Sequence, residues 1–293
     1  MSVWEGLPAD RPVNTPLTWL YVPGDRPGVV VKALSAGADV VLVDLEDAVA
    51  PDRKAYARDA TAELLADPSP GPSPVHVRIN ALDGPLAEAD VRAVAGLPGL
   101  AGLRLPKTNG PAEVREVARW AAGAGGREGL ALYPILESAL GVERAYEIAT
   151  ATPAVRGLAL GEADLRADLG VHDEAGLAWP RSRAVVAARA AGLAPPAQSV
   201  FADVRDLEGL AASCARGRAL GFLGRAAIHP RQLPVIERAY LPTAEEVRAA
   251  QDIVRAAFTD GGALALPDGR FVDAAVVAGA RRTLDLAERR QRV

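Results

Sequence analysis

Short apolar runs of strand length alternate along this chain with alanine-rich segments that have helical spacing. The apolar runs span Thr18–Val22, Val40–Leu45, Val75–Asn80, Gly102–Leu105, Leu130–Leu136, Gly157–Leu160, Gln198–Phe201 and Gly221–Ile228. Strict alternation of strand and helix predicts a parallel sheet, because parallel neighbours must be joined by crossover connections. Eight such units within residues 1–240 predict an α/β fold of the (β/α)8 TIM-barrel type, with the catalytic groups in this domain.

An open, doubly wound sheet is the alternative fold, and it normally carries a glycine-rich phosphate turn after its first strand. Here that turn reads PGDRP at residues 23–27, and neither G-x-G-x-x-G nor a Walker-type G-x-x-x-x-G-K-[ST] occurs in the chain. The barrel is therefore favoured. Two further helices are predicted at Ala244–Phe258 and Ala274–Arg289. We expect residues 241–293 to form a C-terminal helical appendage or lid, because they are too few to bury a core of their own.

The charge balance and the cysteine content exclude several classes of function. The chain has 293 residues, with 33 Lys and Arg against 37 Asp and Glu, a formal net charge of −4. A chain with this charge balance lacks the basic surface on which nucleic-acid binding depends, so we expect no DNA or RNA partner. A single cysteine, Cys214, forms no internal disulfide, and no Cys/His cluster has zinc spacing. No apolar run is long enough to span a bilayer and no signal peptide is recognised, so we expect a cytoplasmic protein without a membrane partner.

Polar side chains end most of the predicted strands, and in a barrel these ends meet at one mouth, where catalytic groups lie. They are Asp44, Glu46 and Asp47 after the second run, His76, Arg78 and Asn80 in the third, Lys107 after the fourth, Glu137 after the fifth and Asp164 after the sixth. Strand alternation predicts that the three polar residues of the third run face the barrel interior. Structural alternatives exist, since a carboxylate that ends a strand is often a helix N-cap, and a counter-ion role alone would also explain Arg78.

The acidic residues of this mouth, with no cysteine and few histidines, make an oxygen-rich site that suits Mg²⁺, with Mn²⁺ as the alternative. Glu137 and Asp164 are 27 positions apart, one strand–helix unit, so we expect them to end adjacent strands and share the ion. Arg78 beside that ion would grip a carboxylate through two parallel hydrogen bonds. A metal ion next to an arginine makes a site that suits the binding of a 2-keto acid. Phosphate-handling barrels also combine Mg²⁺ with arginine, so that class stays open at this point.

Seven motifs are spread over nearly the whole chain. They read LYVPGDRPGVVVKALSAGADVVLVDLEDAVAPDRKAYAR at 20–58, VRIN at 77–80, LPK at 105–107, ILESALGV at 135–142, GEADLRADLG at 161–170, AIHPRQL at 227–233 and FVDAAVVAGARR at 271–282. Together they resemble the citrate lyase β-subunit family of the HpcH/HpaI aldolase superfamily, whose relatives include malyl-CoA and citramalyl-CoA lyases. The first motif is the most specific of the set.

The resemblance implies a (β/α)8 barrel that binds Mg²⁺ and performs retro-aldol cleavage of a citryl or related 3-hydroxyacyl thioester. The products would be a 2-keto acid such as oxaloacetate and an acetyl thioester. The resemblance implies Glu137 and Asp164 as metal ligands and Arg78 as the residue on the keto-acid carboxylate. It also implies that Glu46 and Asp47 are an acidic pair that orders water near the reacting carbons.

Further roles are implied outside the predicted mouth. Arg26 and Lys32 resemble contacts to the phosphates of the thioester carrier, with solvated helix-start charges as the alternative. Asp273 matches an aspartate that in some relatives reaches a neighbouring subunit's site and assists thioester hydrolysis, which implies a homo-oligomer. One departure is visible, because relatives commonly read GAED where this chain reads GEAD at 161–164. The ligand position is kept, whereas a neighbouring carboxylate moves by one residue.

Other functions stay open on the sequence alone. A stand-alone malyl- or citramalyl-CoA lyase, or a malate-synthase-like thioesterase that uses Asp273, would carry the same motifs. A Schiff-base aldolase would use Lys107 instead of the carboxylates, and a non-catalytic thioester-binding subunit would keep the fold. The sequence leaves open whether the carrier is CoA or an acyl carrier protein, which keto acid is released and whether other lyase subunits take part.

Overall fold

The computed structural model describes residues 15–260, 264–265 and 271–289. The chain divides into two compact units, one formed by Pro16–Glu237 and one that contains the residues from Arg238 onward. The first unit holds the main β-sheet and its covering helices. Within the described ranges, no helix combines the length and the apolar character that a membrane span needs.

The main sheet has seven strands, all parallel, in the order β6-β5-β4-β3-β2-β1-β7. Their bounds are β1 Thr18–Pro23, β2 Val40–Asp44, β3 Val75–Arg78, β4 Leu100–Leu105, β5 Ala131–Leu136, β6 Ala159–Leu160 and β7 Arg225–Ala227. Strands that neighbour each other in sequence also pair in the sheet from β1 to β6, and isolated parallel bridges link both edge strands, β6 and β7, to residues 197–198. The two edges of the sheet are therefore linked, whereas a doubly wound sheet is open. The predicted α/β class and parallel sheet are confirmed, and the doubly wound alternative is wrong.

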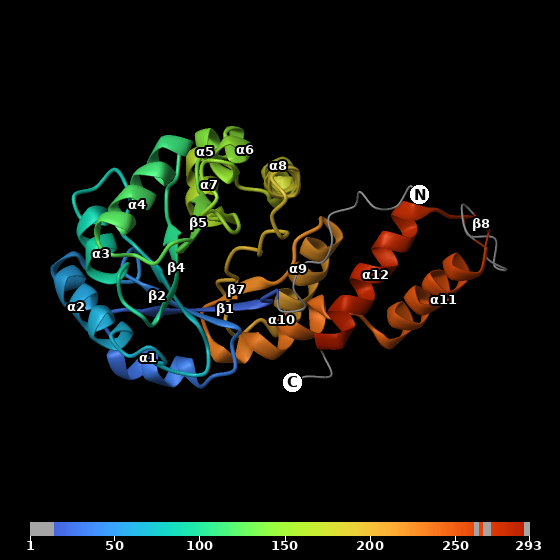
Figure 1. The fold of residues 1–293 in the computed structure, drawn as a ribbon, viewed down its shortest axis with the longest axis horizontal. Helices are drawn as coiled ribbons and strands as arrows, with labels where there is room; N and C mark the ends of the chain where they lie inside the picture. Colours follow the sequence, from blue (N-terminus) through green and yellow to red (C-terminus); the bar gives the residue numbers. More distant parts are fainter. Residues whose placement is uncertain (1–14, 261–263, 266–270, 290–293) are drawn as a thin grey trace. The chain divides into compact units, whose positions relative to one another are not determined.

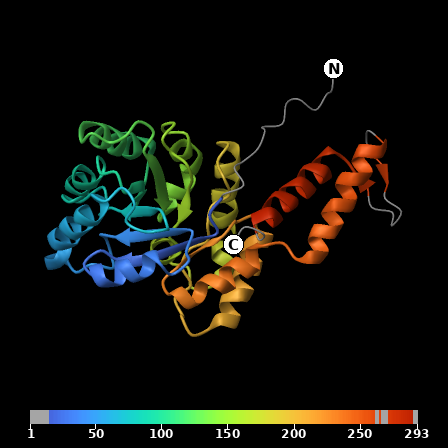
Figure 2. The same ribbon diagram turned by 60° about the horizontal axis from the view of Figure 1, so that its bottom comes forward.

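Helices join the strands, and α1 to α4 lie outside the curved sheet beside β1 to β4 in both views (Figure 1 and Figure 2). The helices of this part are α1 Pro27–Leu34, α2 Lys54–Leu65, α3 Ala87–Val94, α4 Pro111–Gly123, α5 Ala139–Glu143, α6 Ala145–Ala149, α7 Glu162–Leu169, α8 Ala178–Ala190, α9 Leu207–Ala219 and α10 Leu233–Tyr240, with 3-10 turns η1 Pro51–Arg53, η2 Glu174–Leu177 and η3 Pro230–Gln232. Proline begins α1 and α4, where its fixed φ suits the first turn and its missing N–H costs nothing.

The strand β2 shows why these runs fold as parallel strands. Its sequence VVLVD is rich in β-branched residues, and every position is buried. A parallel strand is covered on both faces, so a continuous apolar run is the pattern it needs. The strand ends at Asp44, which pairs in register with Pro23 of β1 and with Arg78 of β3. The register thereby brings polar residues that end separate strands to one level of the sheet.

The prediction of a seventh strand at Gln198–Phe201 is wrong. Only isolated parallel bridges form there, from Ala197 to Ala159 and from Gln198 to Arg225, so the segment links the two edge strands of the sheet. The Ser199 carbonyl accepts a hydrogen bond from the guanidinium of Arg225, which replaces the continuation of the ladder. The helix α7 follows β6 directly and carries Asp164 in its first turn.

The second unit contains two long helices, α11 Ala244–Asp260 and α12 Ala274–Arg289, which pack against each other. A short antiparallel pair, β8 Leu264–Ala265 and β9 Phe271–Val272, lies between them in sequence. Both helices of the predicted C-terminal appendage are therefore present. Apolar side chains recur along each at helical spacing, which explains their pairing.

Candidate active site

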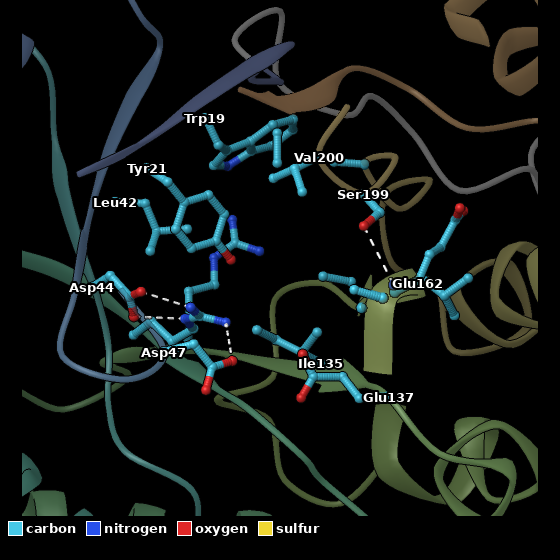
Figure 3. Close-up of a pocket in the computed structure, with 18 of the residues that line it drawn as sticks. Trp19, Tyr21, Leu42, Asp44, Asp47, Ile135, Glu137, Glu162, Ser199 and Val200 are labelled. Carbon is cyan, nitrogen blue, oxygen red and sulfur yellow. Dashed lines mark hydrogen bonds and ion pairs between the residues drawn. The ribbon is translucent and has the colours of Figure 1, made fainter. Parts of the chain in front are cut away.

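A pocket of about 370 Å³ lies at the carboxyl ends of the strands and reaches into the interior of the sheet (Figure 3). Its lining residues that matter for chemistry come from β1 to β6, from the segments that follow these strands and from residues 198–199: Trp19, Tyr21, Asp44, Asp47, Arg78, Arg104, Glu137, Glu162, Asp164, Gln198 and Ser199. This is the end of a parallel sheet at which ligands and catalytic groups are expected.

Arg78, the last residue of β3, lies at the centre of a charge network. Its Nε and Nη2 donate to the two carboxylate oxygens of Asp44 at 2.7 and 2.6 Å. Its Nη1 lies 2.9 Å from Glu46 Oε2 and 3.8 Å from Asp47 Oδ2. Burial lowers the pKa of Arg78, but the hydrogen bonds to Asp44 and the negative charges of Asp44 and Glu46 together raise that pKa above its ordinary value. The guanidinium is therefore a fixed cation at the pocket wall.

Asp44 is a structural residue as well as the partner of Arg78. Its carboxylate accepts hydrogen bonds from the backbone N–H groups of Glu46 and Ala48, at 2.9 and 3.0 Å. These bonds close the turn after β2, which is the local role that a strand-ending carboxylate often has. The turn places Glu46 inside the protein at 4% exposure, whereas the side chain of Asp47 is 57% exposed and lines the pocket.

Lys107 follows β4 and links the two acidic parts of the site. Its backbone N–H donates to Glu137 Oε2 at 2.7 Å, and its Nζ donates to Glu46 Oε1 at 2.5 Å. Its φ of 50° is in the left-handed region, which non-glycine residues rarely adopt. Burial lowers the pKa of Lys107, but the hydrogen bond to Glu46 and the negative charges of Glu46, Asp47 and Glu137 together raise that pKa above its ordinary value. A Schiff-base lysine needs a neutral amine, so this environment disfavours the Lys107 aldolase alternative.

Glu137 follows β5 and presents one unused oxygen to the pocket. The side chain is 5% exposed, and Oε1 accepts no hydrogen bond from any residue in the described ranges. Gly161 makes room for it, because a Cβ at that position would overlap the Glu137 carboxylate. Burial raises the pKa of Glu137 to about 7, and the negative charges of Glu46 and Asp164 act in the same direction. The surroundings of this carboxylate therefore favour a cation beside it.

Asp164 lies in the first turn of α7 and lines the same pocket. It is half-buried, and its side chain makes no hydrogen bond or ion pair with a residue that the structure describes, so it does not act as a helix cap. Asp164 and Glu137 thus offer free carboxylate oxygens to one pocket. Mg²⁺ takes one or two protein carboxylates and completes its shell with water and substrate oxygens. The pair fits that ion. The described ranges contain no group of three or more His, Cys, Asp or Glu side chains that could hold a metal ion.

Glu162 is the carboxylate whose position differs between GEAD in this chain and GAED in relatives, and it is neutralised within the protein. Glu162 accepts two hydrogen bonds from Arg181 of α8, at 2.8 and 2.6 Å. Its backbone N–H donates to Ser199 Oγ at 3.3 Å, which ties the start of α7 to the segment that bridges the sheet edges. Glu162 and Ser199 lie together on the side of the pocket opposite Asp44 and Asp47 (Figure 3). Glu162 therefore shapes the wall and adds no free charge.

Besides Glu46, the predicted residues Arg26, Lys32 and Asp273 are not among the residues that line the pocket. Arg26 occupies the N-cap position of α1 without a capping hydrogen bond from its side chain, Lys32 lies in the last turn of α1, and both are exposed. Asp273 belongs to the second unit, where it caps α12 by accepting the N–H of Val276 at 2.9 Å. Their expected roles stay predictions.

The prediction that the Asn80 side chain faces the barrel interior is wrong. The strand β3 ends at Arg78, two residues earlier, and the Asn80 amide donates to Asp90 of α3 at 2.7 Å. By contrast, sequence reasoning gave no role to Trp19 and Tyr21 of β1, although both line the pocket. Their alternation in the first apolar run was the signal that could have identified them.

Comparisons with known proteins show which family this chain is similar to. The HpcH/HpaI aldolase/citrate lyase family model matches residues 17–230. The citrate lyase subunit beta of Leuconostoc mesenteroides subsp. cremoris is 35% identical over 281 residues, which cover 92% of each chain. A (3S)-malyl-CoA thioesterase of Cereibacter sphaeroides is 34% identical over 276 residues, 92% of this chain and 93% of that protein.

A solved structure of the protein CitE from Mycobacterium tuberculosis, in complex with magnesium, acetoacetate and coenzyme A, superposes with a TM-score of 0.81. It is 33% identical and covers 94% of this chain and 99% of its own. A second structure from the same organism, a citrate lyase beta subunit with oxaloacetate and magnesium, has a TM-score of 0.67 at 34% identity, covering 78% of this chain and 99% of its own. The chain belongs to the HpcH/HpaI aldolase/citrate lyase family, which confirms the predicted family and the carbon–carbon lyase class.

Proposed function

We propose that this protein is a Mg²⁺-dependent lyase of the citrate lyase β-subunit type that cleaves a citryl or related 3-hydroxyacyl thioester. The observation that carries the proposal is the pair Glu137 and Asp164, which face one pocket with oxygens that no described residue uses. Arg78, a fixed cation, lines the same pocket. Magnesium in the solved relatives named above supports the choice of ion, with Mn²⁺ as the alternative.

Each group of the pocket has a task in the retro-aldol reaction. Glu137 and Asp164 would hold Mg²⁺, which would supply a Lewis acid that makes the substrate hydroxyl more acidic. Asp47 accepts the hydroxyl proton through water, because its carboxylate is exposed in the pocket. The carbon–carbon bond then breaks. The hydroxyl carbon becomes the keto carbon, and the electron pair passes to the acetyl thioester as an enolate that takes up a proton. Arg78 holds the keto-acid carboxylate throughout.

Glu46 has a supporting task in this scheme. It is buried between Arg78 and Lys107, with carboxylate oxygens directed at both cations. Burial raises the pKa of Glu46, and the charge of Arg78 opposes that rise. We assign Glu46 to the positioning of Arg78, Lys107 and the water that Asp47 uses, rather than to direct proton transfer.

The proposal extends to the fold, the carrier and the assembly. We propose that the sheet is a (β/α)8 barrel in which residues 197–198 take the place of the eighth strand, between β6 and β7, with residues 241–293 as the appendage.

We propose that the carrier is coenzyme A or an acyl carrier protein, contacted through Arg26 and Lys32. Coenzyme A in the CitE complex supports the first carrier. We place the protein in the cytoplasm as a homo-oligomer, with or without companion lyase subunits.

A second candidate is hydrolysis of the thioester after or instead of cleavage. The relative named as a (3S)-malyl-CoA thioesterase supports it, and so does Asp273 at the start of α12. In this reading Asp273 assists attack of water on the thioester carbonyl, either within its own chain or in a neighbouring subunit.

Metal removal tests the main proposal. The purified protein is treated with EDTA, dialysed, and assayed for release of keto acid from citryl-CoA, (3S)-malyl-CoA and citramalyl-CoA, with and without Mg²⁺. We expect activity to vanish on chelation and to return with Mg²⁺, because the substrate hydroxyl then loses its Lewis acid. Activity that survives rigorous chelation would exclude the scheme. If single-turnover assays yield no product at any metal concentration, the result would favour a non-catalytic thioester-binding subunit.

A further inference from the structure

One buried cation in the pocket has no acid partner in the part of the chain that the structure describes. Arg104, near the end of β4, is 5% exposed and lines the pocket. Its guanidinium makes no hydrogen bond or ion pair with any residue in the described ranges, and its Nε is fully enclosed without an acceptor. Arg225 is buried to the same degree, yet it donates to Ser199, Gln198 and Ser213. A buried charge without hydrogen-bond partners is costly, so Arg104 calls for a ligand.

Aromatic rings hold the Arg104 guanidinium in place without using its N–H groups. Its central carbon lies 4.4 Å from the ring centre of Tyr133 and 5.7 Å from that of Trp19. A ring face attracts the positive charge of the guanidinium but offers no oxygen acceptor. These contacts therefore do not satisfy the N–H donors of Arg104. The rings therefore orient the guanidinium and leave its donors for an acceptor in the pocket.

The sheet register places this cation beside Arg78. The two arginines are paired positions of the neighbouring strands β3 and β4, and both line the pocket. Like charges directly across two strands destabilise a sheet unless each is compensated. Asp44 and Glu46 compensate Arg78. Arg104 has no such neighbour among the described residues, so an anion that enters the pocket would meet it as the uncompensated charge.

We propose that Arg104 is a specificity-determining residue that binds a second carboxylate of the keto acid, so that the substrate class is a 2-keto dicarboxylic acid and its 3-hydroxyacyl thioester. The inference rests on the proposed function, in which Arg78 binds the first carboxylate and Glu137 and Asp164 would hold the metal ion. A guanidinium matches a carboxylate through two parallel hydrogen bonds. A keto acid with one carboxylate would leave Arg104 buried without an acceptor, and sites of this kind discriminate strongly against the analogue that lacks the group.

The test compares two keto acids that differ by one carboxylate. Binding of freshly dissolved oxaloacetate and of pyruvate to the Mg²⁺-loaded protein is measured by calorimetry. We expect wild type to bind oxaloacetate at least tenfold more tightly than pyruvate. Arg104→Gln should weaken oxaloacetate binding about 10–100-fold, the range for loss of a charged hydrogen bond, and should change pyruvate binding less than about threefold. Arg119→Gln is the matched control on the exposed face of α4, and it should change neither affinity.

Each outcome decides the assignment. Equal affinity of wild type for the two acids, or an equal loss of both in Arg104→Gln, would overturn the role of Arg104 and leave the lyase proposal standing. Failure of wild type to bind either acid in a Mg²⁺-dependent way would instead overturn the proposed function, and this inference with it. If Arg104→Gln does not fold, the wild-type preference and the Arg104→Lys variant, which keeps the charge and loses the paired donors, decide the question.

Discussion

Glu137 shows how a single side chain can be unfavourable for folding and useful for binding. Its carboxylate is enclosed by Gly161 and by the N–H of Lys107, close to the negative charges of Glu46 and Asp164. The folded protein therefore prefers the protonated form, with a pKa of about 7 against an ordinary value of 4.5. Such a raised pKa means that the free energy of unfolding falls as the pH rises from about 4.5 to about 7 and then levels off.

The variant Glu137→Gln should remove this penalty. In EDTA at pH 8 we expect it to be more stable than wild type by roughly 1–3 kcal/mol, whereas at pH 4.5 the two should unfold at similar denaturant concentrations. Added Mg²⁺ should stabilise wild type and leave the variant unchanged. Denaturant unfolding at both pH values measures this. The exposed control Glu128→Gln should have no such pH dependence, and a variant that is less stable than wild type at pH 8 would contradict the assignment.

At the scale of elements, the junction of β6 with α7 decides whether the two carboxylates can meet. Gly161 is the N-cap of α7, and its φ of −99° suits any residue. Its requirement is spatial, because a Cβ would enter the space of the Glu137 carboxylate. A strand of two residues is followed at once by a helix whose first turn carries Asp164. This short connection fixes the distance from Asp164 to the end of β5.

We predict that Gly161→Ala lowers the affinity for Mg²⁺ at least tenfold while the chain still folds. The added methyl group displaces the Glu137 carboxylate, and a shift of a metal ligand is poorly tolerated because Mg²⁺ demands near-ideal geometry. Calorimetric titration with Mg²⁺ measures the effect. Gly123→Ala in α4, where an added Cβ meets no neighbour, should bind Mg²⁺ as wild type does. Wild-type affinity in Gly161→Ala would show that Glu137 is not a ligand.

At the scale of the whole molecule, the main sheet and the C-terminal helices belong to different units, and Asp273 belongs to the second. The sheet unit contains every residue that lines the pocket. If the protein only cleaves its substrate, this unit carries all of the chemistry. If it also hydrolyses the thioester, the second unit must contribute through Asp273.

Asp273→Asn separates these two cases. Asparagine keeps the N-cap of α12, so the melting temperature should stay close to that of wild type, while the carboxylate is lost. We expect release of free CoA to fall at least tenfold and release of keto acid to change less than twofold. A thiol assay and a keto-acid assay on the same reaction measure both. Asp273→Ala should lose the cap as well and melt earlier, and equal losses of the two activities would contradict the separation.

Much of the fold was predictable because its signals are local. Alternation of apolar runs with helical segments is a property of neighbouring residues, and it indicated the parallel sheet and the polar strand ends, including Glu137. The errors have physical causes too. Gln198–Phe201 has strand composition, but its ladder is interrupted by a hydrogen bond from Arg225, which lies 26 positions from Ser199. No local pattern contains that contact.

The sequence by itself therefore determined the class of fold, the family and the set of polar residues at one end of the sheet, because periodicity and motif order reside in the chain. Only the tertiary structure decided how these charges are paired. It compensates Asp44 with Arg78 and Glu162 with Arg181, and it leaves Glu137 with a free oxygen in the pocket. Pairing depends on the register between strands and on helices that return to the sheet, so residues far apart in sequence decide which charge stays available for a ligand.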